Sequence, residues 1–71
     1  MFDPDEIASG LNAEQAARLR FLLHAGKSAP REVVDDSLWA LKLLRHFQDA
    51  RAEQRTELNN WGWAVAMRLG D

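Results

Sequence analysis

The sequence predicts a small domain that is all-α or mostly α, built from three to four helices. Two observations support this prediction. Apolar residues recur at spacings of three and four along most of the chain, which is the periodicity of amphipathic helices. Helix-capping residues, together with proline and glycine, divide that pattern into short segments. The 71 residues therefore make one small domain, residues 1–71, with a thin hydrophobic core.

The N-terminal third holds two predicted helices. Asp3 is the expected N-cap of the first helix, which has a proline at its favoured first position and ends at Gly10. Asn12 is expected to cap the second helix, and Gln15 completes a capping box with it. Gly26 then supplies the left-handed position that ends this helix.

The central segment predicts a short helical piece at 30–34 and then the main helix of the domain. Three residues are expected to cap this main helix: Asp35, Asp36 and Ser37. Its apolar arc would consist of Leu38, Ala40, Leu41, Leu43, Leu44 and Phe47. The opposite side would carry polar residues, and Trp39 would lie on the border, close in angle to His46.

Residues 49–57 leave two assignments open. Their helix propensity is high and they contain no glycine or proline, so the central helix could continue through them. The competing assignment is a charged turn, with or without two short strands. It rests on a faint alternation in the segment Arg55-Thr56-Glu57-Leu58.

The closing stretch, residues 56–69, predicts a final helix that holds two of the three tryptophans. Asn59 is the expected N-cap, because its side-chain oxygen can accept from the free N–H groups of the first turn. Three residues at i, i+4 and i+8 share one face and are expected to face the core: Trp61, Val65 and Leu69.

Trp63 and Met67 fall on a different face of the same helix. A tryptophan beside a flexible methionine makes an adaptable apolar patch, of the kind enriched at protein interfaces. Trp63, Met67 and Trp39 are therefore the candidate protein-interface residues. Burial is the structural alternative for tryptophans in so small a core, where each large apolar group contributes about 1.5–3 kcal/mol.

Composition and charge exclude several classes of protein. The chain has no cysteine, so it has neither a disulfide framework nor a thiolate metal site. No apolar run approaches the ~20 residues that span a bilayer. The N-terminus is acidic, unlike a secretory signal. We therefore expect a cytoplasmic protein that does not bind a membrane.

We predict no enzyme, and no catalytic, cofactor or metal site. His24 and His46 are 22 residues apart, and a metal site would need further Asp or Glu ligands brought in by the fold. Asp35 and Asp36 could form a carboxylate pair for acid–base chemistry, but helix capping explains them more simply. The chain has no glycine-rich phosphate loop, and it is too small to bury a pocket of the size that enzymes use.

One short pattern in the closing stretch has a counterpart elsewhere. It reads Leu58-Asn59-x-x-Gly62-x-x-Val65-Ala66. This resembles the Leu-Thr-x-x-Gly-x-x-apolar-apolar ending of small winged-helix or helix-turn-helix-like proteins of phages and mobile elements. Asn59 replaces the threonine, and both residues cap helices. The resemblance implies a helix-turn-helix-like arrangement, with 30–41 as the turn and recognition helix and 50–58 as a minimal wing.

The same resemblance implies DNA binding as an alternative function. The candidate phosphate contacts would then be Lys42, Arg45, Arg51 and Arg55. A recognition helix presents its N-terminal residues to DNA. Here that end carries Asp35 and Asp36, with Glu32 one turn earlier, and three carboxylates would repel phosphate. The net charge of −2 points the same way.

The function that we expect is a non-enzymatic regulator that acts by binding a protein. In size and acidic charge the chain resembles small phage proteins that inhibit host RNA polymerase or block CRISPR complexes. The expected partner is a larger host protein or complex, first RNA polymerase, with modulation of transcription as the result. The alternatives are a helix-turn-helix DNA-binding regulator, an inhibitor of a host defence complex such as CRISPR, and a structural homo-oligomer such as a homodimer.

Overall fold

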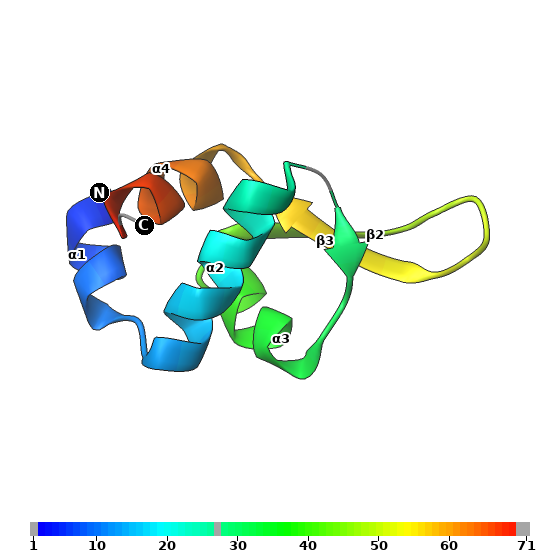
Figure 1. Ribbon diagram of the computed structural model, residues 1–71, viewed down its shortest axis with the longest axis horizontal. Coiled ribbons are helices and arrows are strands. Elements are labelled where there is room, and N and C mark those ends of the chain that lie inside the picture. The colour runs from blue at the N-terminus through cyan, green and yellow to red at the C-terminus, as the bar shows by residue number, and fades with distance from the viewer. Residues whose placement is uncertain (1, 27, 70–71) are drawn as a thin grey trace.

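The computed structural model describes residues 2–26 and 28–69. Seven elements follow one another in this part of the chain (Figure 1): α1 (Pro4–Gly10), α2 (Ala13–Ala25), β1 (Ala29–Pro30), α3 (Val33–Ala40), β2 (Leu44–Gln48), β3 (Gln54–Leu58) and α4 (Asn60–Arg68). Helices predominate, as expected. The all-α prediction is nevertheless wrong, because the three strands form an antiparallel sheet in the order β1-β3-β2.

The predicted boundaries of the first two helices are confirmed. Asp3 caps α1 by accepting a hydrogen bond from the backbone N–H of Asp5 at 3.1 Å. Asn12 and Gln15 form the predicted capping box, with the Asn12 Oδ1 atom 2.8 Å from the Gln15 backbone nitrogen. Gly26 ends α2 with a φ of 66°, in the left-handed region that favours glycine.

The central helix is much shorter than predicted. It ends at residue 40, and β2 begins at residue 44, so the prediction of one helix as far as Phe47 is wrong. The predicted helical piece at 30–34 is wrong in its first part, because β1 ends there. Since α3 begins at Val33, the predicted caps Asp36 and Ser37 lie inside it. Asp35 also lies inside but takes part in the cap, because its Oδ2 atom accepts from the Glu32 backbone N–H at 2.8 Å.

A turn at Lys42 ends α3. The backbone N–H of Lys42 donates to the Trp39 carbonyl at 2.8 Å, and that of Leu43 donates to the Leu38 carbonyl at 3.1 Å. These two bonds define a Schellman motif, in which Lys42 has a φ of 65°. Leu38 and Leu43 are both fully buried, so the turn directs the chain into the core.

The assignment of 49–57 to a charged turn with two short strands is confirmed, and a continuing helix is wrong. The Asp49 carboxylate accepts hydrogen bonds from the backbone N–H groups of Arg51 and Glu53, both at 2.9 Å, which shapes the loop between β2 and β3. Ala52 completes the loop with a φ of 62°. The hairpin extends well beyond the helical body (Figure 1).

The core lies where α2, α3 and α4 meet the sheet. Its buried apolar residues are Leu19, Leu22, Ala29, Leu38, Leu43, Leu44, Val65 and Ala66. α1 packs against α4 at one end of the domain, close to where the described chain begins and ends (Figure 1). Among the described helices, none is long and apolar enough to cross a membrane.

The core face of α4 is rotated from the predicted one, because Gly62 and not Trp61 faces the core. Gly62 lies so close to the turn between α3 and β2 that a Cβ atom there would be 2.1 Å from the Leu43 carbonyl oxygen. This contact turns Gly62 and Val65 inward, both of them buried. Trp61 precedes Gly62 by about 100° of helical rotation. It is 45% exposed, so its predicted core position is wrong.

Candidate functional site

Trp39 lies near the C-terminal end of α3 with 56% of its surface exposed. Its indole ring stacks on the imidazole ring of His46 in β2, with 5.9 Å between the ring centroids and 15° between the planes. The two residues are neighbours, as predicted, but they meet across the turn that ends α3 and not along one helix. The stack holds the indole against the body while leaving much of it open to solvent.

Trp61 is fixed on the first turn of α4. Its ring stacks on the ring of Phe2, with 4.7 Å between centroids and 16° between the planes. Phe2 is itself half-buried and packs against the core. One side of the indole is therefore supported by the N-terminal segment, and the remaining surface is exposed.

Two adjoining surface hollows lie between these two tryptophans. One hollow in the surface is lined by Trp39, Ala40, Lys42, Leu44 and Asn59. The adjoining hollow is lined by Lys42, Asn59, Asn60 and Trp61. The two hollows share Lys42 and Asn59, so we treat them as one feature, the tryptophan groove, with an indole at each end.

Asn59 holds the two sides of the tryptophan groove together. Its Oδ1 atom caps α4 by accepting from the Gly62 backbone N–H at 2.8 Å, as predicted. Its Nδ2 atom donates to the Lys42 carbonyl oxygen, also at 2.8 Å. Its backbone N–H donates to the Leu43 carbonyl oxygen at 3.2 Å. One residue therefore joins the turn after α3 to the start of α4.

The groove has an apolar and positive character. Lys42 carries the one charge among its lining residues. Its side chain is exposed, and it forms no ion pair within the described part of the chain. Since Lys42 lines both hollows, its ammonium group can pair with an anionic group whose neighbours are apolar.

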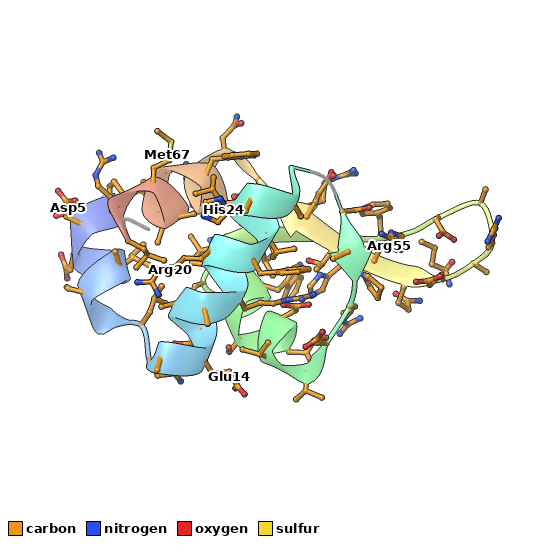
Figure 2. All side chains as sticks on the ribbon, in the orientation of Figure 1. Asp5, Glu14, Arg20, His24, Arg55 and Met67 are labelled. Atoms are coloured by element: carbon orange, nitrogen blue, oxygen red, sulfur yellow. The ribbon has the colours of Figure 1, made fainter. Side chains whose placement is uncertain are left out.

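Trp63 and Met67 remain interface candidates on another side of α4. Trp63 is partly exposed and lines a separate hollow together with residues of α2 and β3. Met67 is 65% exposed and points away from the body (Figure 2). Trp63 follows Trp61 by about 200° around the helix. The predicted set therefore divides: Trp39 shares its surface with Trp61 and not with Trp63.

The four basic residues proposed to bind phosphate do not form one free cationic surface. Arg45 donates from its Nε atom to Glu57 at 2.8 Å. Arg55 donates to Glu53 at 3.2 Å and to the backbone and hydroxyl oxygens of Ser28. Lys42 lies in the tryptophan groove, and Arg51 lies on the exposed hairpin loop.

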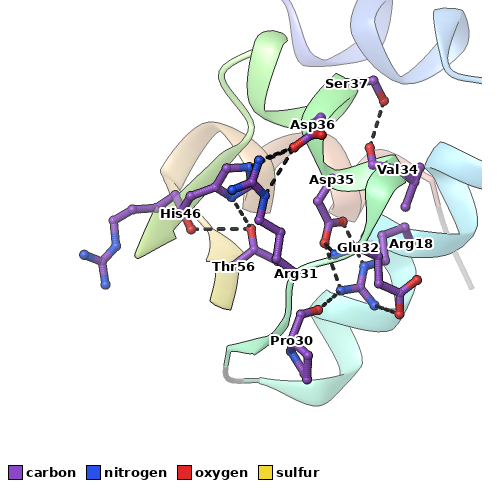
Figure 3. Close-up of polar contacts among 11 residues, drawn as sticks. Arg18, Pro30, Arg31, Glu32, Val34, Asp35, Asp36, Ser37, His46 and Thr56 are labelled. Atoms are coloured by element: carbon purple, nitrogen blue, oxygen red, sulfur yellow. Dashed lines mark hydrogen bonds and ion pairs between the residues drawn. The ribbon is translucent and has the colours of Figure 1, made fainter. Parts of the chain in front are cut away.

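The acidic residues at the start of α3 also have partners (Figure 3). Asp35 is fully buried, and the Arg18 guanidinium donates to both of its carboxylate oxygens, at 2.9 and 3.0 Å. Asp36 pairs with Arg31. The prediction that Asp35 would present its charge to DNA is therefore wrong, whereas Glu32 is exposed beside Arg18.

His46 lies between Asp36 and Thr56 in an arrangement that superficially resembles a catalytic triad (Figure 3). Its Nδ1 atom is 3.0 Å from the Thr56 hydroxyl, and its Nε2 atom is 3.9 Å from the Asp36 carboxylate. Thr56 is fully buried, so a substrate cannot reach its hydroxyl. His46 therefore lies inside the fold and not on the exposed polar face predicted for it.

Burial lowers the pKa of His46 below its usual value of 6.5. The Arg31 guanidinium lowers that pKa further, while Asp35 and Asp36 oppose the shift. His46 is consequently neutral at pH 7. Within residues 2–26 and 28–69, no group of three or more His, Asp or Glu side chains is placed to hold a metal ion.

Comparison of the chain with protein-family models, with characterised proteins and with solved structures finds no match.

Proposed function

We propose that this protein is a non-enzymatic regulator that binds a larger protein through the tryptophan groove. The supporting observation is the groove itself, with Trp39 and Trp61 half-exposed at its ends and Asn59 fixing its floor. Aromatic side chains held in place by stacking contribute large contact areas at little cost in conformational entropy, and tryptophan is enriched among the residues that dominate binding energy.

The distribution of charge supports a protein partner over DNA. A DNA-binding surface gains most of its affinity from several cations that can reach phosphates. Here Arg45 and Arg55 are already paired with glutamates, and the exposed acids Asp36 and Glu32 at the start of α3 occupy two further arginines. A protein partner requires no such cationic surface.

RNA polymerase is the first partner that we propose, with transcription as the process that is modulated. The support is the small size and acidic charge of the chain, which resemble those of phage inhibitors of that enzyme. A host defence complex such as CRISPR is the next candidate. Both partners imply a cytoplasmic location.

Capture followed by reconstitution tests the proposal. The tagged protein should retain one dominant complex from an extract of its host, and the same complex should bind again when both components are purified. Trp39→Ala and Trp61→Ala should each weaken reconstituted binding by about tenfold or more, as expected for central aromatic contacts. Circular dichroism confirms that each variant is folded.

Val33→Ala is the matched control. Val33 is an apolar residue with 89% of its surface exposed, and it does not line the tryptophan groove. Equal loss of binding in this control, or none in either tryptophan variant, would count against the groove. Loss only in Trp63→Ala would place the interface on the other side of α4. Failure to bind purified RNA polymerase would remove that partner.

DNA binding is a second candidate, and the hairpin favours it. The loop between β2 and β3 projects from the body as a wing would, and it carries Arg51 (Figure 1). In this case binding to duplex DNA should fall steeply as salt rises, and Arg51→Glu should abolish it. A duplex that fails to bind at low ionic strength rejects this function.

A further inference from the structure

We infer that the tryptophan groove receives a partner segment that carries a carboxylate between large apolar side chains. Lys42 would pair with that carboxylate, while Trp39 and Trp61 would contact the apolar side chains on either side. This inference rests on the proposed function and adds to it the chemistry of the segment that binds. Its occupant is an acidic, apolar stretch of protein.

The charge of the groove favours an acidic ligand. Lys42 is the one charged residue in the lining of the groove. No carboxylate within the described chain pairs with it. Asn59 offers only one free amide N–H there, because the other N–H of its Nδ2 group donates to the Lys42 carbonyl, and this remaining donor carries no charge. The polar group best able to attract a ligand to the middle of the groove is therefore the lysine ammonium.

The backbone conformation of Lys42 also favours a role for its side chain in binding. The residue occupies the left-handed position of a Schellman motif, at a φ of 65°. Glycine is the usual residue there, because a side chain is strained in this conformation. Nothing in the packing of the motif requires the lysine side chain, which is exposed. The side chain is thus present at a site where folding alone favours its absence, which points to a role in binding.

Single-stranded nucleic acid is the other ligand that stacks on aromatic rings beside a cation. Such ligands bind in a positively charged channel that follows several phosphates. One lysine is not a channel, and the chain has a net charge of −2. A carboxylate-bearing protein segment needs one cation and two apolar contacts, which this groove supplies.

Selection from a displayed library of random short peptides tests the inference. The protein carrying Trp63→Phe is used, so that changes in tryptophan fluorescence report only Trp39 and Trp61. We expect the enriched peptides to share an aspartate or glutamate flanked by large apolar residues. A synthetic copy of the best peptide should alter tryptophan fluorescence, and its affinity should weaken as salt rises.

Variants at Lys42 separate binding from folding. Lys42→Gly and Lys42→Asn both suit the left-handed backbone, and we expect each to weaken peptide binding by about three- to tenfold. Lys42→Gly should at the same time raise the melting temperature. Lys42→Glu should weaken binding further. The expected combination is higher stability with lower affinity.

Two control variants match these changes elsewhere. Ala52→Gly relieves the backbone strain at Ala52, which also has a left-handed conformation and lies in the hairpin loop. This variant should raise stability without changing affinity. Arg51→Glu alters net charge as much as Lys42→Glu does, but on the exposed hairpin. If Arg51→Glu weakens binding as much as Lys42→Glu, the effect is one of net charge and the inference fails.

Other outcomes also decide the question. Enrichment of peptides without acids, or of basic peptides, overturns the inference. The inference is also overturned if single-stranded oligothymidylate binds tightly and displaces the peptide. If the reconstituted partner depends on Trp39 and Trp61 but not on Lys42, the proposed function stands and the acidic segment is rejected. If it depends on none of the three, both are rejected.

Discussion

The side chain of Asn59 donates a hydrogen bond to the backbone carbonyl of Lys42 while its oxygen caps α4. The bond crosses from the first turn of one helix to the turn that ends another. Because Trp39 precedes Lys42 by three residues and Trp61 follows Asn59 by two, this contact sets the spacing of the two indoles. A single amide therefore serves both the stability of the fold and the shape of the groove.

Variants of Asn59 should separate these two roles. Asn59→Ala loses the cap and the bond to Lys42, and we expect a decrease of about 2 kcal/mol in the free energy of unfolding. Asn59→Asp retains an acceptor for the cap but places a carboxylate against the Lys42 carbonyl. If the bond to Lys42 contributes more than the cap does, Asn59→Asp should lower the free energy of unfolding almost as much as Asn59→Ala. Urea denaturation measures both.

Asn12→Asp supplies the control for that comparison. Asn12 caps α2 through its Oδ1 atom, and its Nδ2 atom has no bond within the described residues. This substitution should change the free energy of unfolding by less than about 0.5 kcal/mol. Equal effects of aspartate at the two caps would show that the bond to Lys42 contributes little.

Gly62→Ala should destabilise the protein although alanine favours helices. A Cβ atom at this position would lie 2.1 Å from the Leu43 carbonyl oxygen and 3.0 Å from Leu58 Cδ2. The helix propensity of alanine offers about 1 kcal/mol, whereas overpacking against a backbone oxygen costs about 1–3 kcal/mol or more. We expect a lower melting temperature. Gly10→Ala is the control, since a Cβ atom there has nothing within 4 Å.

The Arg18–Asp35 pair should be sensitive to the loss of one partner. Asp35→Asn or Arg18→Met leaves a buried charge without its counterpart, which costs about 3–5 kcal/mol. That is a large part of the roughly 4–10 kcal/mol expected for a domain of this size. Circular dichroism at 25 °C should show partial or full unfolding.

The double variant Arg18→Met with Asp35→Leu tests the same pair in the other direction. Replacing both charges by apolar groups removes the unpaired charge, so most of the lost stability should return. The Arg18 guanidinium also donates to the Pro30 carbonyl at 2.8 Å, which links α2 to β1. A double variant no more stable than the single ones would assign the main effect to the backbone contacts of the pair, which are this one and the Glu32 N–H that Asp35 accepts at 2.8 Å.

The elements with local signals could be predicted from the sequence, and those without could not. α1, α2 and α4 begin at the predicted caps, because capping depends on residues three positions apart. The end of α3 was missed because Lys42 takes a position that usually carries glycine. Without a signal for the turn at Lys42, the apolar spacing of 38–47 predicts one continuous helix, and β2 therefore could not be predicted.

The candidate site divides along the same line. The exposure of Trp39 could be anticipated from its place at the edge of an apolar arc. The groove depends on Asn59 reaching Lys42 and on Gly62 approaching Leu43, which are contacts between residues 17 and 19 positions apart. The spacing of apolar residues predicts Trp61 in the core. This spacing carries no information on how closely the backbones at Gly62 and Leu43 approach each other.

His46 should make stability depend on pH in the mildly acidic range. Its pKa is lowered in the folded protein, so between that lowered value and 6.5 the unfolded chain binds a proton that the folded chain does not. The free energy of unfolding is therefore at its full value above pH 6.5 and falls as the pH drops through this window. The decrease ends once the folded protein is protonated as well.

His46→Gln should flatten this dependence, because glutamine preserves polar contact with Thr56 but does not titrate. Urea denaturation between pH 7 and about 5 measures the slope, above the range where most carboxylates titrate. His24→Gln is the control, since His24 is exposed on α2 and should leave the slope unchanged. An NMR titration of His46 with a midpoint above 6.5 would contradict the prediction. It would mean that Asp36, 3.9 Å from Nε2, outweighs both burial and Arg31.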